Sequence, residues 1–163
     1  MNLILYACYY NPLFHNPQLI DLWRTKELQQ VFIDSVGDYY YGNESDPSGG
    51  FYLVYIEGIK RPVAITGYWM IDETKAGLRW TAIDHSIAPD LHLPELMHKL
   101  WQHLPFHVQE LFECANTQKV LEVFCKDDLF KPEHRPEVIK QVIASNGGDA
   151  GVLVMRRPES KKT

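Results

Sequence analysis

The chain has few cysteines and no cluster of basic residues. Three cysteines stand among 163 residues, at positions 8, 114 and 125, and none forms a Cys-x-x-Cys pair. This spacing excludes a dense disulfide framework and favours a reducing, cytoplasmic setting. The formal net charge is −5 and the lysines and arginines form no stripe, so we do not expect nucleic acid as a main partner.

Long hydrophobic runs and common catalytic motifs are also missing. The apolar segment 1–10 is too short to span a bilayer and lacks a basic leader, so we expect no membrane association. No Gly-x-Ser-x-Gly, Walker loop or Gly-x-Gly-x-x-Gly motif occurs. His98, His103 and His107 are close in sequence, but Pro105 interrupts any shared helical face. The sequence therefore predicts no metal site.

The first half of the chain is rich in strand patterns. Segments 51–57, 63–71 and 78–84 are apolar, with many β-branched and aromatic residues, and turn residues at 58–61 separate the first two. We expect these three strands to form a contiguous antiparallel meander. Earlier in the chain, a strand is predicted at 3–9, helical periodicity covers 17–36, and 42–50 has the composition of a loop.

Helices and strands alternate in the second half. Pro94 opens a helix that Pro105 ends, and a strand at 108–114 should run parallel to strand 78–84 because a helical crossover joins them. Helices at 118–124 and 136–145 and a strand at 150–156 follow. We expect a largely buried core that includes Trp69, Trp80, Leu96, Leu100, Leu111 and Phe112.

The strand-rich first half and the alternating second half together predict an α+β (mixed α/β) fold. Its central mixed sheet should be mostly antiparallel and flanked by helices. At this length we expect one domain over residues 1–158 and a disordered tail at 159–163.

This order of elements resembles the GNAT superfamily of acyl-CoA-dependent N-acetyltransferases. In that family, the loop after the third core strand and the next helix N-terminus hold the cofactor pyrophosphate with backbone amides. The matching stretch here is 87–97, in which Ile87–Asp90 fits the lead-in to that loop. His92 stands where the family has Arg or Gln, and Glu95 and Met97 fall near its glycines. The resemblance implies acetyl-CoA as cofactor, contacted by Ile83, Leu91, His92, Leu93, Glu95, Leu96 and Gln118.

The resemblance also implies catalytic roles. The family's general base is commonly a Glu, an Asp or an ordered water near the third core strand, where Asp84 and His85 stand. A downstream family motif, Asn-x-x-Ala-x-x-Phe/Leu-Tyr-x-x-x-Gly-Phe, places Cys125 at the tyrosine that protonates the departing thiolate, although a shift of one residue stays open. The structural alternatives are a loop cap for Asp84, a solvated His85 and an inert buried Cys125.

Two functions remain open at this point. One is an acyl-CoA-dependent N-acyltransferase that transfers an acetyl group to an unidentified small-molecule or protein amine. The other is a catalytically silent GNAT-fold binding or structural protein, for example of a phage or mobile element, that has lost the pyrophosphate site. Residues 84–95 hold three carboxylates, no Lys or Arg, and a proline without an N–H, which favours the second. A protein partner or a homo-oligomer is compatible with both.

Overall fold

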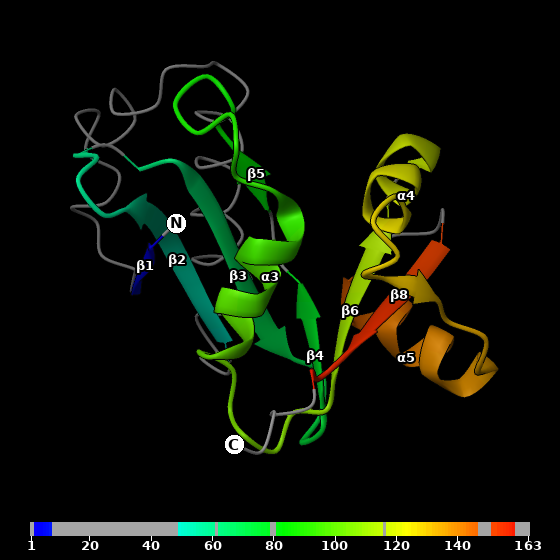
Figure 1. Ribbon diagram of the computed structural model, residues 1–163. Helices are drawn as coiled ribbons and strands as arrows, with labels where there is room; N and C mark the ends of the chain where they lie inside the picture. Colours follow the sequence, from blue (N-terminus) through cyan, green and yellow to red (C-terminus); the bar gives the residue numbers. More distant parts are fainter. Residues whose placement is uncertain are drawn as a thin grey trace. The chain divides into compact units, whose positions relative to one another are not determined.

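The structure, a computed structural model, describes residues 2–7, 49–60, 62–78, 81–115, 117–146 and 151–158. Within these ranges the chain forms the following elements (Figure 1): β1 (Leu3–Ala7), β2 (Gly49–Ile56), β3 (Ala64–Met70), β4 (Lys75–Leu78), β5 (Ala82–Ile83), α3 (Leu93–Trp101), β6 (Glu110–Ala115), α4 (Gln118–Cys125), β7 (Lys131–Pro132), α5 (Pro136–Asn146) and β8 (Gly151–Arg156). Several predicted features lie outside the described residues: the end of the first strand at 8–9, the helical patterns at 17–36, most of the loop at 42–50, Trp80 and the tail at 159–163.

The strands pair in the order β1-β2-β3-β4-β6-β8-β7, and β5 pairs with β3. β4 and β6 run parallel, with Lys75 opposite Glu110 and Gly77 opposite Phe112. The pairs β1–β2, β3–β5, β6–β8 and β7–β8 are antiparallel. The expected mixed, mostly antiparallel sheet is confirmed, as is the parallel pairing that follows the helical crossover.

The predicted bounds of the third core strand are wrong. The strand begins at Lys75 rather than at 78, and it occurs in two pieces, β4 and β5. The Asp72 side chain explains the early start, because its Oδ1 accepts hydrogen bonds from the N–H groups of Thr74 (2.9 Å) and Lys75 (3.0 Å). This side chain closes a tight turn that returns the chain to the sheet within three residues.

The chain divides into two compact units, Met1–Tyr68 with Arg79–Leu100 and Trp69–Leu78 with Trp101–Thr163. In the first unit, Val54, Val63 and Ile65 are fully buried, and the Tyr52 and Tyr68 rings stack with centroids 6.4 Å apart. The Asp84 N–H donates to the carbonyl of Val63 (2.7 Å), which ties the loop after β5 to this core. The expectation of a single domain stays a prediction.

Helix α3 is amphipathic, as the sequence predicts. Leu96, Met97 and Leu100 are fully buried, whereas Glu95 and His98 are exposed. The helix ends at Trp101, earlier than the predicted end at Leu104. No helix among the described residues is long and apolar enough to cross a membrane.

The second unit is built on β6 and β8. One face of these strands forms a core with α5 through the residues Phe112, Cys114, Val138, Val142, Val152 and Val154. Helix α4 covers the other face, since a Cβ added at Gly151 would lie 2.8 Å from Leu121 of that helix. Leu111 and Phe112 are fully buried as predicted, and Trp69 is partly exposed. The edge strand β7 was missed, because it is two residues long and contains Pro132.

Candidate functional site

Asp84 is a buried carboxylate at the start of the loop that follows β5. Its side chain accepts two hydrogen bonds at Oδ1, from the N–H (3.0 Å) and the hydroxyl (2.5 Å) of Ser86. Its backbone carbonyl accepts from the N–H groups of Ile87 and Ala88. The residue is 2% exposed, and Oδ2 has no hydrogen-bond partner among the described residues. Asp84 therefore caps the loop with one oxygen, and its other oxygen is buried without a hydrogen-bond partner among the described residues.

His85 is exposed and tied to the same loop. Its ring Nε2 lies 3.2 Å from the carbonyl oxygen of Leu91. With a proton on Nε2 this contact is a hydrogen bond, and Nδ1 then keeps a lone pair that can accept a proton. Its predicted role as a base stays a prediction.

The start of α3 offers fewer backbone amides to an anion than the sequence suggests. The His92 carbonyl accepts the first helical hydrogen bond, from Leu96 (3.4 Å), and the Leu91 N–H donates to Ala88 (3.2 Å). Pro94 has no N–H. Of the amides at 91–96, those of His92, Leu93 and Glu95 have no described partner. Three amides at the positive end of a nine-residue helix fit a phosphate, although the exposed Glu95 carboxylate opposes it.

Other predicted cofactor contacts in this segment differ in exposure. Leu91 and Leu96 are fully buried, so only their backbones lie near the surface. Ile83, opposite Ala64 in the β3–β5 pairing, and Leu93 are half-buried. The structure thus places Ile83, Asp84, His85, Leu91, His92, Leu93, Glu95 and Leu96 in one continuous segment of the first unit, from β5 to α3.

In the second unit, β6 lies between β4 and β8 in the sheet. Its pairing with β8 continues to Ala115 opposite Gly151, and the described pairing with β4 runs to Gly77 opposite Phe112. Residues 79–80, which follow β4 in the chain, lie outside the described ranges.

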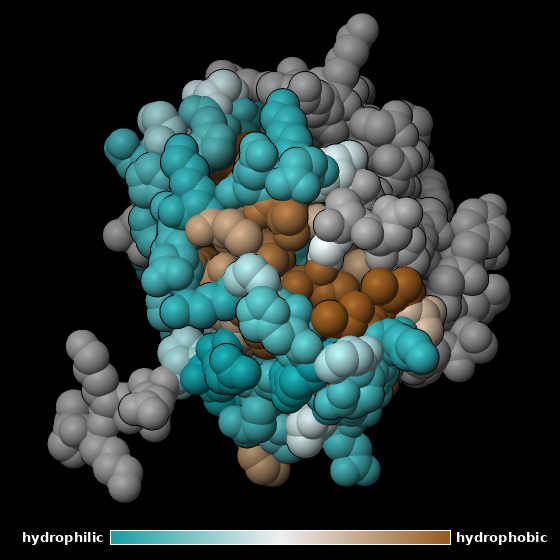
Figure 2. Space-filling model, turned by 90° about the vertical axis from the view of Figure 1, so that its right-hand side faces the viewer, coloured by the Kyte–Doolittle hydropathy of each residue, from teal (hydrophilic) through white to brown (hydrophobic). Residues whose placement is uncertain are grey.

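Helix α4 holds the two remaining predicted residues. The Thr117 hydroxyl accepts from the N–H of Val120 (3.2 Å) and caps the helix, which places Gln118 exposed in the first turn. Cys125 is half-buried at the helix end and borders a pocket of about 370 Å³ between α4, α5 and β8, together with Leu121, His134, Ile139 and Leu153. Figure 2, seen from the side on which α4 and α5 lie in Figure 1, shows apolar side chains gathered next to hydrophilic ones.

The backbone after α4 favours a different alignment with the family motif. Asp128 has a positive φ of 56°, the conformation for which the motif uses glycine. The motif tyrosine lies four residues before that glycine, which is Phe124 here rather than Cys125. Phe124 is buried against the edge of the Phe130 ring, with centroids 5.3 Å apart, and has no hydroxyl. The role of Cys125 stays a prediction.

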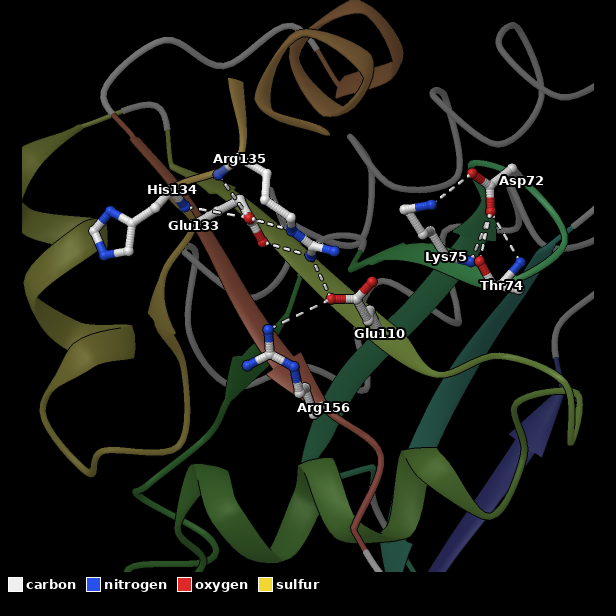
Figure 3. Close-up of polar contacts among 8 residues, drawn as sticks. All are labelled: Asp72, Thr74, Lys75, Glu110, Glu133, His134, Arg135 and Arg156. Atoms are coloured by element: carbon white, nitrogen blue, oxygen red, sulfur yellow. Dashed lines mark hydrogen bonds and ion pairs between the residues drawn. The ribbon is translucent and has the colours of Figure 1, made fainter. Parts of the chain in front are cut away.

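An ion-pair network that the sequence did not reveal secures α5 (Figure 3). The Arg135 guanidinium bonds Glu133 through Nε (2.7 Å) and Glu110 through Nη2 (2.5 Å), and Arg156 approaches Glu110 at 4.0 Å. Glu133 also accepts the backbone N–H groups of His134 and Arg135. Hydrogen bonding to Arg135 lowers the pKa of Glu133 to about 2. These charges neutralise one another, so we assign them a structural role.

Known proteins of similar structure identify the fold of this chain. No family model matches the chain, and no curated protein matches its sequence significantly. The structure is similar to a GNAT-family acetyltransferase from Staphylococcus aureus, with a TM-score of 0.63, 15% identity, and coverage of 95% of this chain and 98% of that one. The chain has the GNAT fold. An acetyltransferase from Thermus thermophilus gives a TM-score of 0.59 at 15% identity and covers 98% of both chains. An aminoglycoside acetyltransferase in complex with coenzyme A and kanamycin gives 0.62 at 13% identity, covering 96% of this chain and 95% of that one.

The GNAT fold accounts for the elements that carry the predicted residues. The third core strand expected from the resemblance corresponds to β4 and β5, and the helices expected after it correspond to α3 and α4. No group of three or more His, Cys, Asp or Glu side chains in the described ranges could hold a metal ion.

Proposed function

We propose that the protein is an acyl-CoA-dependent N-acyltransferase that transfers an acetyl group to an amine. The observation that supports this most strongly is the likeness to acetyltransferases over at least 95% of each chain in the comparisons above. A fold alone does not fix a function, so the chemistry has to come from particular residues. Asp84 is the residue on which we base it.

Asp84 is suited to the role of general base. Ser86 fixes the carboxylate through Oδ1, and the unpartnered Oδ2 can accept a proton from the attacking amine. As the nitrogen bonds to the thioester carbonyl carbon, the amine proton passes to Oδ2, and the C–S bond then breaks. Acyl-CoA supplies the activated thioester for this reaction. The N–H groups of His92, Leu93 and Glu95 would hold its phosphates.

The second candidate is a GNAT-fold protein without catalysis. It is favoured by the residues between Asp84 and Glu95, where three carboxylates occur without a Lys or Arg. A diphosphate bound there meets like charge, which weakens binding unless water screens it. In this interpretation the protein binds a macromolecule or assembles with its own copies.

Calorimetric titration with acetyl-CoA, combined with an assay of released thiol, separates the two candidates. We expect wild type to bind, and Asp84→Asn to bind equally well while losing roughly 10²–10⁴-fold in turnover. Glu137→Gln is the control, because this carboxylate is exposed on α5 and lies outside the segment from Asp84 to Glu95. If wild type gives no binding at millimolar acetyl-CoA, the enzyme proposal fails. Equal turnover of Asp84→Asn and wild type would remove Asp84 as the base.

A further inference from the structure

Ser86 is an exposed serine whose hydroxyl is hydrogen-bonded to a buried carboxylate. Its Oγ donates to Asp84 Oδ1 at 2.5 Å, and its backbone N–H donates to the same oxygen at 3.0 Å. Ser86 is exposed to solvent, whereas Asp84 is only 2% exposed. The short hydrogen bond therefore connects a residue at the surface with a carboxylate beneath it.

The burial of Asp84 limits how it can act as a base. A base has to come within hydrogen-bond reach of the proton that it removes, directly or through one intermediate group. Asp84 Oδ2 is buried, and the N–H groups of Ile87 (3.1 Å) and Ala88 (3.0 Å) close the loop over the Asp84 carbonyl. An amine that arrives from solvent meets Ser86 first, so direct transfer of its proton to Oδ2 requires the loop to open.

The direction of this hydrogen bond determines what the Ser86 hydroxyl can offer to a ligand. A serine hydroxyl has one proton and two lone pairs, and an ionised carboxylate can only accept. The proton of Ser86 therefore lies in the 2.5 Å contact, a length typical of a charge-assisted O–H···O⁻ bond. The lone pairs of Ser86 Oγ are left to accept from another donor, and the N–H of an amine is such a donor.

Asp72 provides a structural contrast with the same kind of cap (Figure 3). Its Oδ1 accepts the N–H (2.9 Å) and the hydroxyl (3.3 Å) of Thr74, two residues further along the chain. Its other oxygen, Oδ2, binds Lys75 (3.1 Å) and Gln141 (2.9 Å). The Asp72 carboxylate is therefore fully hydrogen-bonded and balanced by a cation, whereas Asp84 has a shorter bond to its hydroxyl and an Oδ2 without a described partner.

On the basis of the function proposed above, we propose that Ser86 relays the proton of the attacking amine to Asp84. As the C–N bond forms, the amine proton passes to Ser86 Oγ while the Ser86 proton passes to Asp84 Oδ1. The C–S bond then breaks, its electron pair goes to sulfur, and the thiolate takes a proton from water. Asp84 returns its proton to solvent through Ser86, which restores both groups. Direct transfer to Oδ2 is the alternative route.

The relay lies in the same unit as the amides proposed to hold the acyl donor. The loop that carries Ser86 leads directly into α3, and His85 Nε2 lies 3.2 Å from the carbonyl oxygen of Leu91, just before that helix. Ser86 and the first turn of α3 thus belong to one loop-and-helix segment. An amine at Ser86 and a thioester held at the start of α3 would meet within this segment.

The first test measures turnover of the full chain with acetyl-CoA and an amine that wild type accepts. Ser86→Ala removes the hydroxyl but keeps the N–H bond to Asp84, so kcat should fall about 10²-fold or more while the affinity for acetyl-CoA stays unchanged. Ser86→Thr keeps a hydroxyl and should restore most of the turnover. Thr74→Ala is the matched control, because it removes a hydroxyl from the similar cap at Asp72, and it should change neither quantity.

The second test separates a relay from a hydroxyl that only positions Asp84. Single-turnover rates of acyl transfer are measured in mixtures of light and heavy water. Two protons move together in the relay, so the wild-type rate should follow a curve as the deuterium fraction rises. The residual rate of Ser86→Ala should follow a straight line, because one proton then moves.

The outcomes distinguish failure of the relay from failure of the proposed function. A straight line for wild type, or turnover of Ser86→Ala equal to that of wild type, would overturn the relay and leave Asp84 to act directly through Oδ2. If wild type binds no acetyl-CoA, the enzyme proposal fails and the relay fails with it. The wild-type isotope measurement needs no variant, so it decides the matter even if Ser86→Ala does not fold.

Discussion

Glu133 offers a direct test of how the second unit is stabilised. Its side chain is 3% exposed and binds the Arg135 guanidinium at 2.7 Å. Hydrogen bonding to Arg135 lowers the pKa of Glu133 from 4.5 to about 2, a shift that corresponds to roughly 3 kcal/mol of folding free energy. The Arg135 side chain is 40% exposed, so water screens the pair. We therefore expect Glu133→Gln to lose about 1–2 kcal/mol at neutral pH.

Because the pKa of Glu133 is lowered in the folded state, its contribution to stability depends on pH in a definite direction. A carboxyl whose folded-state pKa is lowered stabilises the protein above its unfolded-state pKa, here near 4.5, and that contribution disappears as pH falls toward 2. Urea denaturation of wild type and Glu133→Gln should show a difference at neutral pH that shrinks through this window. Asp128→Asn is the control, because its ion pair with Lys131 is exposed and 3.8 Å long, and asparagine tolerates a positive φ. If Glu133→Gln loses as much unfolding free energy in acid as at neutral pH, the electrostatic explanation is refuted.

Two further predictions concern α3. Leu100→Ala should destabilise the protein by about 2–5 kcal/mol in the same denaturation assay, because Leu100 is fully buried, whereas Phe106→Ala, at an 86% exposed ring, should change stability by less than about 0.5 kcal/mol. A small loss for Leu100→Ala would mean that α3 does not pack as described. Glu95→Gln should tighten acetyl-CoA binding about two- to fivefold in calorimetry, because it removes a carboxylate beside the amides of the first helical turn. Unchanged affinity would place the phosphates elsewhere.

Local patterns were enough to predict most elements of the fold. Apolar runs with many β-branched and aromatic residues predicted β2 and β3, and helical periodicity predicted α4 and α5. The helical crossover between β4 and β6 predicted their parallel pairing, which the register confirms. These features depend on residues close together in the sequence, which is why the sequence reveals them.

The misses come from contacts over longer distances or from single side chains. The early start of β4 depends on the Asp72 side chain, and the Arg135–Glu110 pair joins residues 25 positions apart. No local sequence pattern predicts an ion pair between residues so far apart. The role of Cys125 at the end of α4 stays a prediction.

The choice between catalysis and silent binding depends on two carboxylates in one segment. Asp84 keeps one buried oxygen without a partner among the described residues, and an unsatisfied buried group costs about 1–3 kcal/mol of folding free energy. A protein without chemistry at this position would gain stability from any partner for that oxygen. Glu95 is exposed, and in the first turn of α3 its charge favours the helix dipole, so it costs little in either case. Water screens the exposed charge far more than the buried one, so Glu95 weakens phosphate binding without abolishing it. The buried oxygen of Asp84 is the costlier feature, and for that reason we place acyl transfer ahead of silent binding.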